Sequence, residues 1–195
     1  MTQLSFSSFD SSLLVRDAQG RYLPASVDQI LDAARQVIDQ KIQRGMSFTS
    51  PTLVKEYLCA KLAGFEHEVF AVLFLDSQHR LIEYTEMFRG TIDSASVYPR
   101  EVVKEALRLN AAAVIFSHNH PSGNSEPSRA DEAITKRLKE ALALVDVRSL
   151  DHVIVAGSDT TSFAERGLIL GASAPFFASP DFANWLHGVH AAEIV

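Results

Sequence analysis

The stretch Ala112-Ala113-Val114-Ile115-Phe116 leads directly into Ser117-His118-Asn119-His120 and then into Pro121. A short, continuous apolar run of this kind is typical of a buried strand. Pro121 and Gly123 predict a sharp turn just beyond it, which leaves the end of the strand open as a cleft. Because side chains two residues apart on an extended chain point the same way, we expect the imidazoles of His118 and His120 to face one point.

Helix and strand signals on both sides of this stretch predict the rest of the fold. An apolar run at 69–75 and a second predicted strand at 80–88 flank a polar turn and are typical of a β-hairpin. Helical spacing begins at Pro99 and again over 128–144, and a further strand is predicted over 147–155. The order β-β-α-β-α-β predicts an α/β fold, a sandwich in which helices flank a mixed sheet.

Residues 1–49 are predicted to form an N-terminal extension with one amphipathic helix. Apolar residues recur at helical spacing from Val27 to Ile42, Ser26 and Gln29 predict a capping box, and Gly45 is expected to end the helix. Before it, residues 13–23 are consistent with a small hairpin, and a partly ordered arm is the alternative.

A second helix is predicted after Ser50, which can cap it, with Pro51 at its first position and Gly64 at its end. This helix opens the predicted main domain, residues 50–168, and leaves a C-terminal tail at 169–195. The tail is aromatic, and it could pack on the domain or bind a partner; packing is the simpler interpretation. Its aromatic residues are Phe176, Phe177, Phe182 and Trp185.

Composition limits the class of protein. Apolar residues make up 47% of the 195 residues and charged residues 22%, which is typical of a globular protein. The net charge of −6 argues against a broad grip on nucleic acid, which needs a clustered basic surface. The single cysteine, Cys59, and the lack of a signal peptide or a long apolar run predict a cytoplasmic protein without a membrane segment.

His118, His120 and Asp131 are the candidate metal ligands. Asp131 follows His120 by eleven residues, in the first turn of the predicted helix, so a strand–loop–helix return can bring its carboxylate back to the histidines. Two histidines and one carboxylate are a known zinc set with a free fourth position for water. Bound metal lowers the pKa of that water from about 15.7 towards about 7.

Hydrolysis also needs a base and a group that stabilises an oxyanion. Glu68 precedes the first apolar strand, where a desolvated carboxylate would suit general acid/base chemistry. Glu66, Glu83 and Glu86 are its rivals, but only Glu68 has the expected spacing before that strand. Ser128 is the nearest hydroxyl donor for an oxyanion, although a serine with an acidic residue three positions later is also ordinary helix capping.

These residues resemble the JAMM signature of the MPN/JAB metalloproteases, and the RadC-like bacterial branch most closely. The resemblance covers roughly residues 50–168. It rests on Glu68-Val69-Phe70, Pro99-Arg100-Glu101-Val102-Val103, His118-Asn119-His120-Pro121-Ser122-Gly123, Pro127-Ser128-x-x-Asp131 and Leu150-Asp151-His152-x-Ile154-Val155.

The resemblance implies an MPN/JAB, cytidine-deaminase-like sandwich. It also implies one zinc ion per chain on His118, His120 and Asp131, with Glu68 as base and Ser128 as oxyanion donor. The expected reaction is hydrolysis of a peptide or isopeptide bond, with a peptide or protein as substrate. Many RadC-like proteins carry an N-terminal helix-hairpin-helix region, whereas residues 1–49 show one good helix and no glycine-rich hairpin.

The sequence is also consistent with several alternatives. His118 and His120 alone could be polar residues at a strand end, and the same ligands accept other divalent ions. Asp151-His152 could be a structural pair, a second metal set or a group near the site, and Asn119 could shape the loop or touch substrate. The competing functions are a metal-dependent nuclease and a non-catalytic scaffold in a replication or repair complex, where nucleic acid would be met through other proteins.

Overall fold

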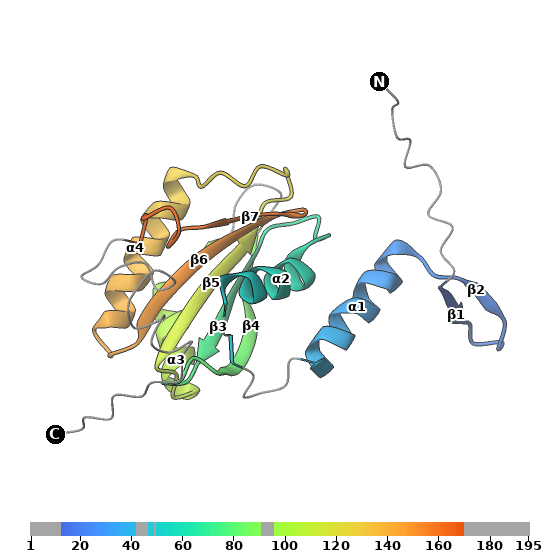
Figure 1. The fold of residues 1–195 in the computed structure, drawn as a ribbon, viewed down its shortest axis with the longest axis horizontal. Coiled ribbons are helices and arrows are strands. Elements are labelled where there is room, and N and C mark those ends of the chain that lie inside the picture. The colour runs from blue at the N-terminus through green and yellow to red at the C-terminus, as the bar shows by residue number, and fades with distance from the viewer. Residues whose placement is uncertain (1–12, 42–46, 49, 91–95, 170–195) are drawn as a thin grey trace. The chain divides into compact units, whose positions relative to one another are not determined.

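The computed structural model of the chain describes residues 13–41, 47–48, 50–90 and 96–169 (Figure 1). The backbone divides into two compact units, residues 1–41 and residues 42–195. Gly45 and the aromatic tail lie outside the described residues, so the predictions made for them stay predictions.

The first unit contains a hairpin and a helix. β1 (Leu14–Arg16) pairs antiparallel with β2 (Tyr22–Pro24), and α1 (Val27–Lys41) follows. The predicted hairpin is present. The carboxylate of Asp17 stabilises its turn by accepting hydrogen bonds from the backbone N–H groups of Gln19 and Arg21. The predicted capping box is also present: Ser26 N donates to Gln29 Oε1 at 2.9 Å, and Gln29 N donates to Ser26 Oγ at 3.2 Å.

The second unit is a mixed sheet between helices. Its elements are α2 (Pro51–Leu62), β3 (Val69–Leu75), β4 (Leu81–Arg89), α3 (Pro99–Arg108), β5 (Ala113–Asn119), α4 (Arg129–Ala143), β6 (Arg148–Ala156) and β7 (Asp159–Ser162). The strand order is β4-β3-β5-β6-β7. Only the β5–β6 pair is parallel, because α4 crosses over between these two strands. The predicted mixed α/β class is confirmed.

Helices cover both faces of this sheet (Figure 1). On one face, α3 and α4 pack on alternate residues of β3 and β5; this core comprises Phe70, Val72, Phe74, Val102, Ala106, Ala111, Val114, Phe116, Leu138, Leu142 and Val147. α2 packs on the opposite side against β5 and β6, with Val54, Tyr57, Leu58 and Leu62 buried. β3 and β5 are buried along their whole length, which explains the apolar runs of all seven residues of β3 and of the first four residues of β5.

Two strand assignments differ from the sequence prediction. β5 continues to Asn119, so His118 lies inside the strand, because pairing with β6 extends to Asn119 opposite Val155. The backbone N–H of His120 still donates to the Val155 carbonyl at 2.8 Å, so both histidines keep the extended geometry. β7 was not predicted, because its polar sequence Asp-Thr-Thr-Ser lacks an apolar run. In the part of the chain that the structure describes, no helix is both long and apolar enough to cross a bilayer.

Candidate metal centre

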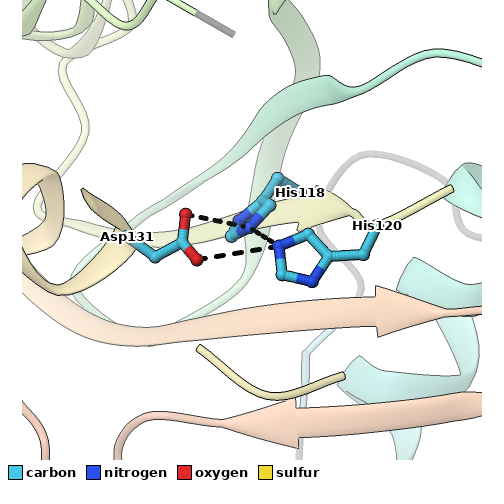
Figure 2. A group of neighbouring side chains, drawn as sticks. All are labelled: His118, His120 and Asp131. Carbon is cyan, nitrogen blue, oxygen red and sulfur yellow. Dashed lines mark hydrogen bonds and ion pairs between the residues drawn. The ribbon is translucent and has the colours of Figure 1, made fainter. Parts of the chain in front are cut away.

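His118, His120 and Asp131 meet where β5 ends and α4 begins (Figure 2). The two Nε2 atoms of the histidines are 2.9 Å apart. Asp131 Oδ1 lies 3.4 Å from Nε2 of His118, and Oδ2 lies 3.6 Å from Nε2 of His120. The His118 side chain is almost fully buried, whereas 17% of the His120 side chain is exposed, so the cluster opens to solvent on the His120 side.

The start of α4 directs the Asp131 carboxylate to this point. Ser128 is the N-cap: its Oγ accepts from the Asp131 backbone N–H at 3.1 Å, and its own N–H donates to Asp131 Oδ2 at 2.7 Å. The capping interpretation of this pair is therefore correct in the structure. It does not compete with a site role, because the same carboxylate also faces both histidines.

The loop after β5 determines which nitrogen of His120 faces the cluster. Gly123 has a φ of +78°, and its N–H donates to the His120 carbonyl, which closes a tight turn. Nδ1 of His120 lies 2.6 Å from the Asn124 carbonyl oxygen. Because a carbonyl can only accept, Nδ1 carries the proton, and in the neutral ring Nε2 presents its lone pair to the cluster.

Burial and charge move the pKa values of the three residues apart. Burial lowers the pKa of His118 to about 4, against the attraction of Asp131. The hydrogen bond to Asp131 raises the pKa of His120. Burial acts to raise the pKa of Asp131, but bonds from His120 and Ser128 and the proximity of His118 outweigh it, so this pKa lies below its ordinary value. At neutral pH the cluster thus holds a neutral His118 and a charged carboxylate, the forms that bind metal.

The spacing of the donor atoms fits a divalent metal ion. Ligand atoms about 2.0–2.1 Å from a tetrahedral zinc ion are about 3.3–3.4 Å from one another. The three separations here are 2.9, 3.4 and 3.6 Å. Two lone pairs that faced each other at 2.9 Å would repel, so a proton or a metal ion must lie between the two Nε2 atoms, and the donor types and their spacing both suit a metal ion.

Glu68 and Ser128 line one cleft with the three clustered residues. The cleft has a volume of about 1200 Å³, and its walls include Leu62, Phe65, Glu66, Phe70, Val97, Asn119, Glu126, Ile134, Arg137 and Val155. Glu68 is half-buried, and its charge contributes to the raised pKa of His120, which places the carboxylate near the cluster. Its rival Glu66 is also on the cleft wall but exposed, whereas Glu83 and Glu86 are on β4 and do not line the cleft.

Asn119 shapes the chain around Glu68. Its Oδ1 accepts from the Val69 N–H at 2.8 Å, and its Nδ2 donates to the His67 carbonyl at 3.0 Å. The side chain therefore holds the backbone on both sides of Glu68, from a position between the two clustered histidines. Of the two roles that the sequence left open for Asn119, the structure supports the shaping of the loop.

Asp151 and His152 are both fully buried, and only His152 contacts the cluster: its Nε2 lies 2.8 Å from Nδ1 of His118. Thr135 on α4 in turn contacts Nδ1 of His152 at 2.6 Å. The sequence analysis missed Thr135. The available signal was a polar residue on the buried stripe of α4, four residues after Asp131 and three before Leu138.

The sequence of this chain matches a known protein family. The sequence profile described as "RadC-like JAB domain" matches residues 48–168. A UPF0758 protein of Vibrio cholerae is 63% identical over 139 residues, which cover 71% of this chain and 87% of that protein. A UPF0758 protein of Methylibium petroleiphilum is 60% identical over 145 residues, or 74% of this chain and 65% of that protein. The chain thus spans just under two thirds of the second relative, and neither name states an activity.

Proposed function

Because this chain belongs to the RadC-like JAB domain family, we propose that it is a zinc-dependent hydrolase of the JAMM type that cleaves a peptide or isopeptide bond. One observation carries the proposal: three donor atoms, two imidazole nitrogens and a carboxylate oxygen, converge at the open end of β5. This donor set is typical of catalytic zinc sites that keep one position for water or substrate.

Different residues of the cleft would serve different steps of hydrolysis. When bound, zinc would polarise the substrate carbonyl and make water a nucleophile at neutral pH. Glu68 takes the proton from the water as general base and passes it to the leaving amine as general acid. The Oγ of Ser128 accepts from the Asp131 N–H, so its hydroxyl proton is available to a developing oxyanion.

The charge of the cleft favours a peptide over a phosphodiester. Among the described residues its wall carries the carboxylates of Glu66, Glu68, Glu126 and Asp131 and one arginine, Arg137, and Glu126 is ion-paired with Arg166. Phosphate oxygens are recognised by arginine, lysine or backbone donors, and a polyanionic strand would be repelled by these carboxylates. The cleft therefore supports the peptidase proposal over the nuclease alternative. We expect the protein to act in the cytoplasm, because its single cysteine is consistent with a reducing compartment.

The first test is metal content. We expect elemental analysis of the purified protein to find about one zinc per chain. In His120→Ala the zinc should be lost, while circular dichroism stays unchanged because that side chain is partly exposed. Protein that contains no metal and takes up none when zinc is supplied would favour the scaffold alternative.

The second test separates the base from its neighbour. Glu68→Gln and Glu66→Gln remove a carboxylate from the same cleft, two residues apart. On a panel of fluorogenic peptides and isopeptide-linked conjugates, we expect Glu68→Gln to lose activity by about 10²-fold or more and to keep its zinc. Glu66→Gln should stay within a few-fold of the wild type. Equal losses in the two variants would contradict the assignment of Glu68 as the base, and turnover of DNA but not of peptides would favour the nuclease.

A further inference from the structure

We propose that Thr135 and His152 are positioning residues that fix the tautomer of His118, so that its Nε2 lone pair faces the metal site. The benefit of this tautomer for metal binding rests on the proposed function, whereas the tautomer itself is a property of the metal-free protein. The two residues form one buried chain of contacts that begins at the carbonyl of Asp131 and ends at Nδ1 of His118.

The first step is the direction of the Thr135 hydroxyl. Its Oγ1 lies 2.5 Å from the carbonyl oxygen of Asp131 and 2.6 Å from Nδ1 of His152. A carbonyl can only accept, and a hydroxyl has one proton, so Thr135 donates that proton to Asp131. Towards His152 the hydroxyl can then only accept. Nδ1 of His152 must therefore carry a proton.

The protonated Nδ1 of His152 determines which nitrogen of His118 carries a proton. His152 is fully buried among the rings of Phe70, Phe116 and Phe163, where a charged imidazole is strongly disfavoured. A neutral ring with its proton on Nδ1 has only an acceptor at Nε2. That Nε2 lies 2.8 Å from Nδ1 of His118, so the His118 nitrogen is the donor in this bond.

The proton on Nδ1 of His118 determines which of its atoms can bind a metal ion. With its proton on Nδ1, the neutral ring of His118 has its lone pair on Nε2, the atom 3.4 Å from Asp131 Oδ1. A proton on Nε2 would point into the space that the ion needs. Without the relay either tautomer is open to the ring, and metal binding would first have to move a proton. The relay also joins β5 to the backbone of α4, the two elements that supply the clustered residues.

The test compares Thr135→Val, which keeps the shape but removes the hydroxyl, with Thr135→Ser, which keeps the hydroxyl. Nitrogen-15 histidine spectra of the metal-free proteins report the tautomer of each ring. We expect His118 to carry its proton on Nδ1 in the wild type and in Thr135→Ser, and to show a mixture in Thr135→Val. Zinc affinity, measured by competition with a chromogenic chelator, should fall about 10–100-fold in Thr135→Val and be restored in Thr135→Ser.

A second pair covers the case in which Thr135→Val fails to fold. Glutamine at position 152 offers a carbonyl acceptor and an N–H donor, so His152→Gln should keep the His118 tautomer, whereas His152→Leu should lose it. A wild-type His118 protonated on Nε2, or an unchanged tautomer and zinc affinity in Thr135→Val or His152→Leu, would overturn the proposal. If the tautomer is as expected but no zinc is bound, the relay stands and the proposed hydrolase fails.

Discussion

Asp151 and His152 are neighbours on β6, and both are fully buried, yet they serve opposite faces of one sheet. His152 faces α4 and contacts His118 of the metal centre. Asp151 faces the other way: Oδ1 accepts from the backbone N–H of Ala164 at 2.9 Å, and Oδ2 accepts from the hydroxyl of Ser162 at 2.6 Å. This carboxylate thus ties the end of β7, and the chain just after it, to β6.

Neighbouring residues of a strand therefore have separate roles, because they lie on opposite faces of the sheet. Side chains of consecutive strand residues point to opposite faces, so two polar residues in a row cannot share one site without leaving the strand. The sequence suggested a second metal set as one interpretation of this pair. Among the described residues, the one group that could hold a metal contains neither of them. His152 therefore belongs to the site, and Asp151 to the stability of the fold.

The largest expected effect is that of Asp151→Ala on stability. The side-chain oxygens of Asp151 accept hydrogen bonds from the backbone of His152, the backbone of Ala164 and the hydroxyl of Ser162. Their removal leaves these buried donors unpaired, which should cost about 3–5 kcal/mol of unfolding free energy in urea at pH 5. The folded fraction should still bind zinc within a few-fold of the wild type. Loss of zinc affinity without loss of stability would erase the distinction between the two faces.

The pH dependence of stability should report the same carboxylate. Burial raises the pKa of Asp151 to about 6 from an ordinary value of 3.8. A raised pKa in the folded state means that the contribution to stability is complete below the ordinary pKa and is lost as pH rises through about 6. Two pKa units correspond to about 3 kcal/mol.

The neutral variant Asp151→Asn lacks this titration. We therefore expect the unfolding free energy of the metal-free wild type to fall by about 3 kcal/mol relative to Asp151→Asn between about pH 4 and pH 7. The measurement is a series of urea denaturation curves for both proteins at each pH. Parallel pH profiles would show that the carboxylate keeps its ordinary pKa.

His152→Leu should show the reverse pattern to Asp151→Ala. Leucine fills the apolar surroundings of the ring but offers no acceptor to Nδ1 of His118, so zinc affinity should fall about 10–100-fold, or about 1.4–2.7 kcal/mol. Chelator competition measures the affinity, and urea denaturation of the metal-free protein measures stability. The loss of stability should be smaller than in Asp151→Ala. A larger loss would mean that His152 is chiefly structural.

The smallest expected effect concerns the hydrogen bond between Ser162 and Asp151. Ser162→Ala removes the hydroxyl that donates to Asp151 Oδ2, and should cost about 1 kcal/mol in urea at pH 7. Ser149→Ala is the matched control on the same sheet, because the Ser149 Oγ is buried without a hydrogen-bond partner. Its removal should be neutral or stabilising. Equal effects of the two substitutions would show that the Ser162 bond contributes nothing specific.

Local sequence patterns were enough to predict most elements of the fold. The apolar runs at 69–75 and 147–155 and the cap at Ser50 each report a local preference, and the structure has β3, β6 and α2 at those places. β7 escaped prediction because a short polar strand is formed by pairing with a neighbour, not by its own composition. β5 also ends later than predicted for the same reason, because its pairing with β6 continues past Phe116 to Asn119 opposite Val155.

For the site, the sequence by itself determined which residue types stand at metal-binding spacing: His118 and His120 two apart, and Asp131 in the first turn of the next helix. The residues that surround them follow from the folded chain alone. Asn119 bonds the backbone of His67 and of Val69, on either side of Glu68, and Thr135 contacts His118 through His152. These contacts depend on the register of β6 beside β5 and on the packing of α4 against the sheet. No local sequence pattern encodes the distance between segments that meet only when the chain folds.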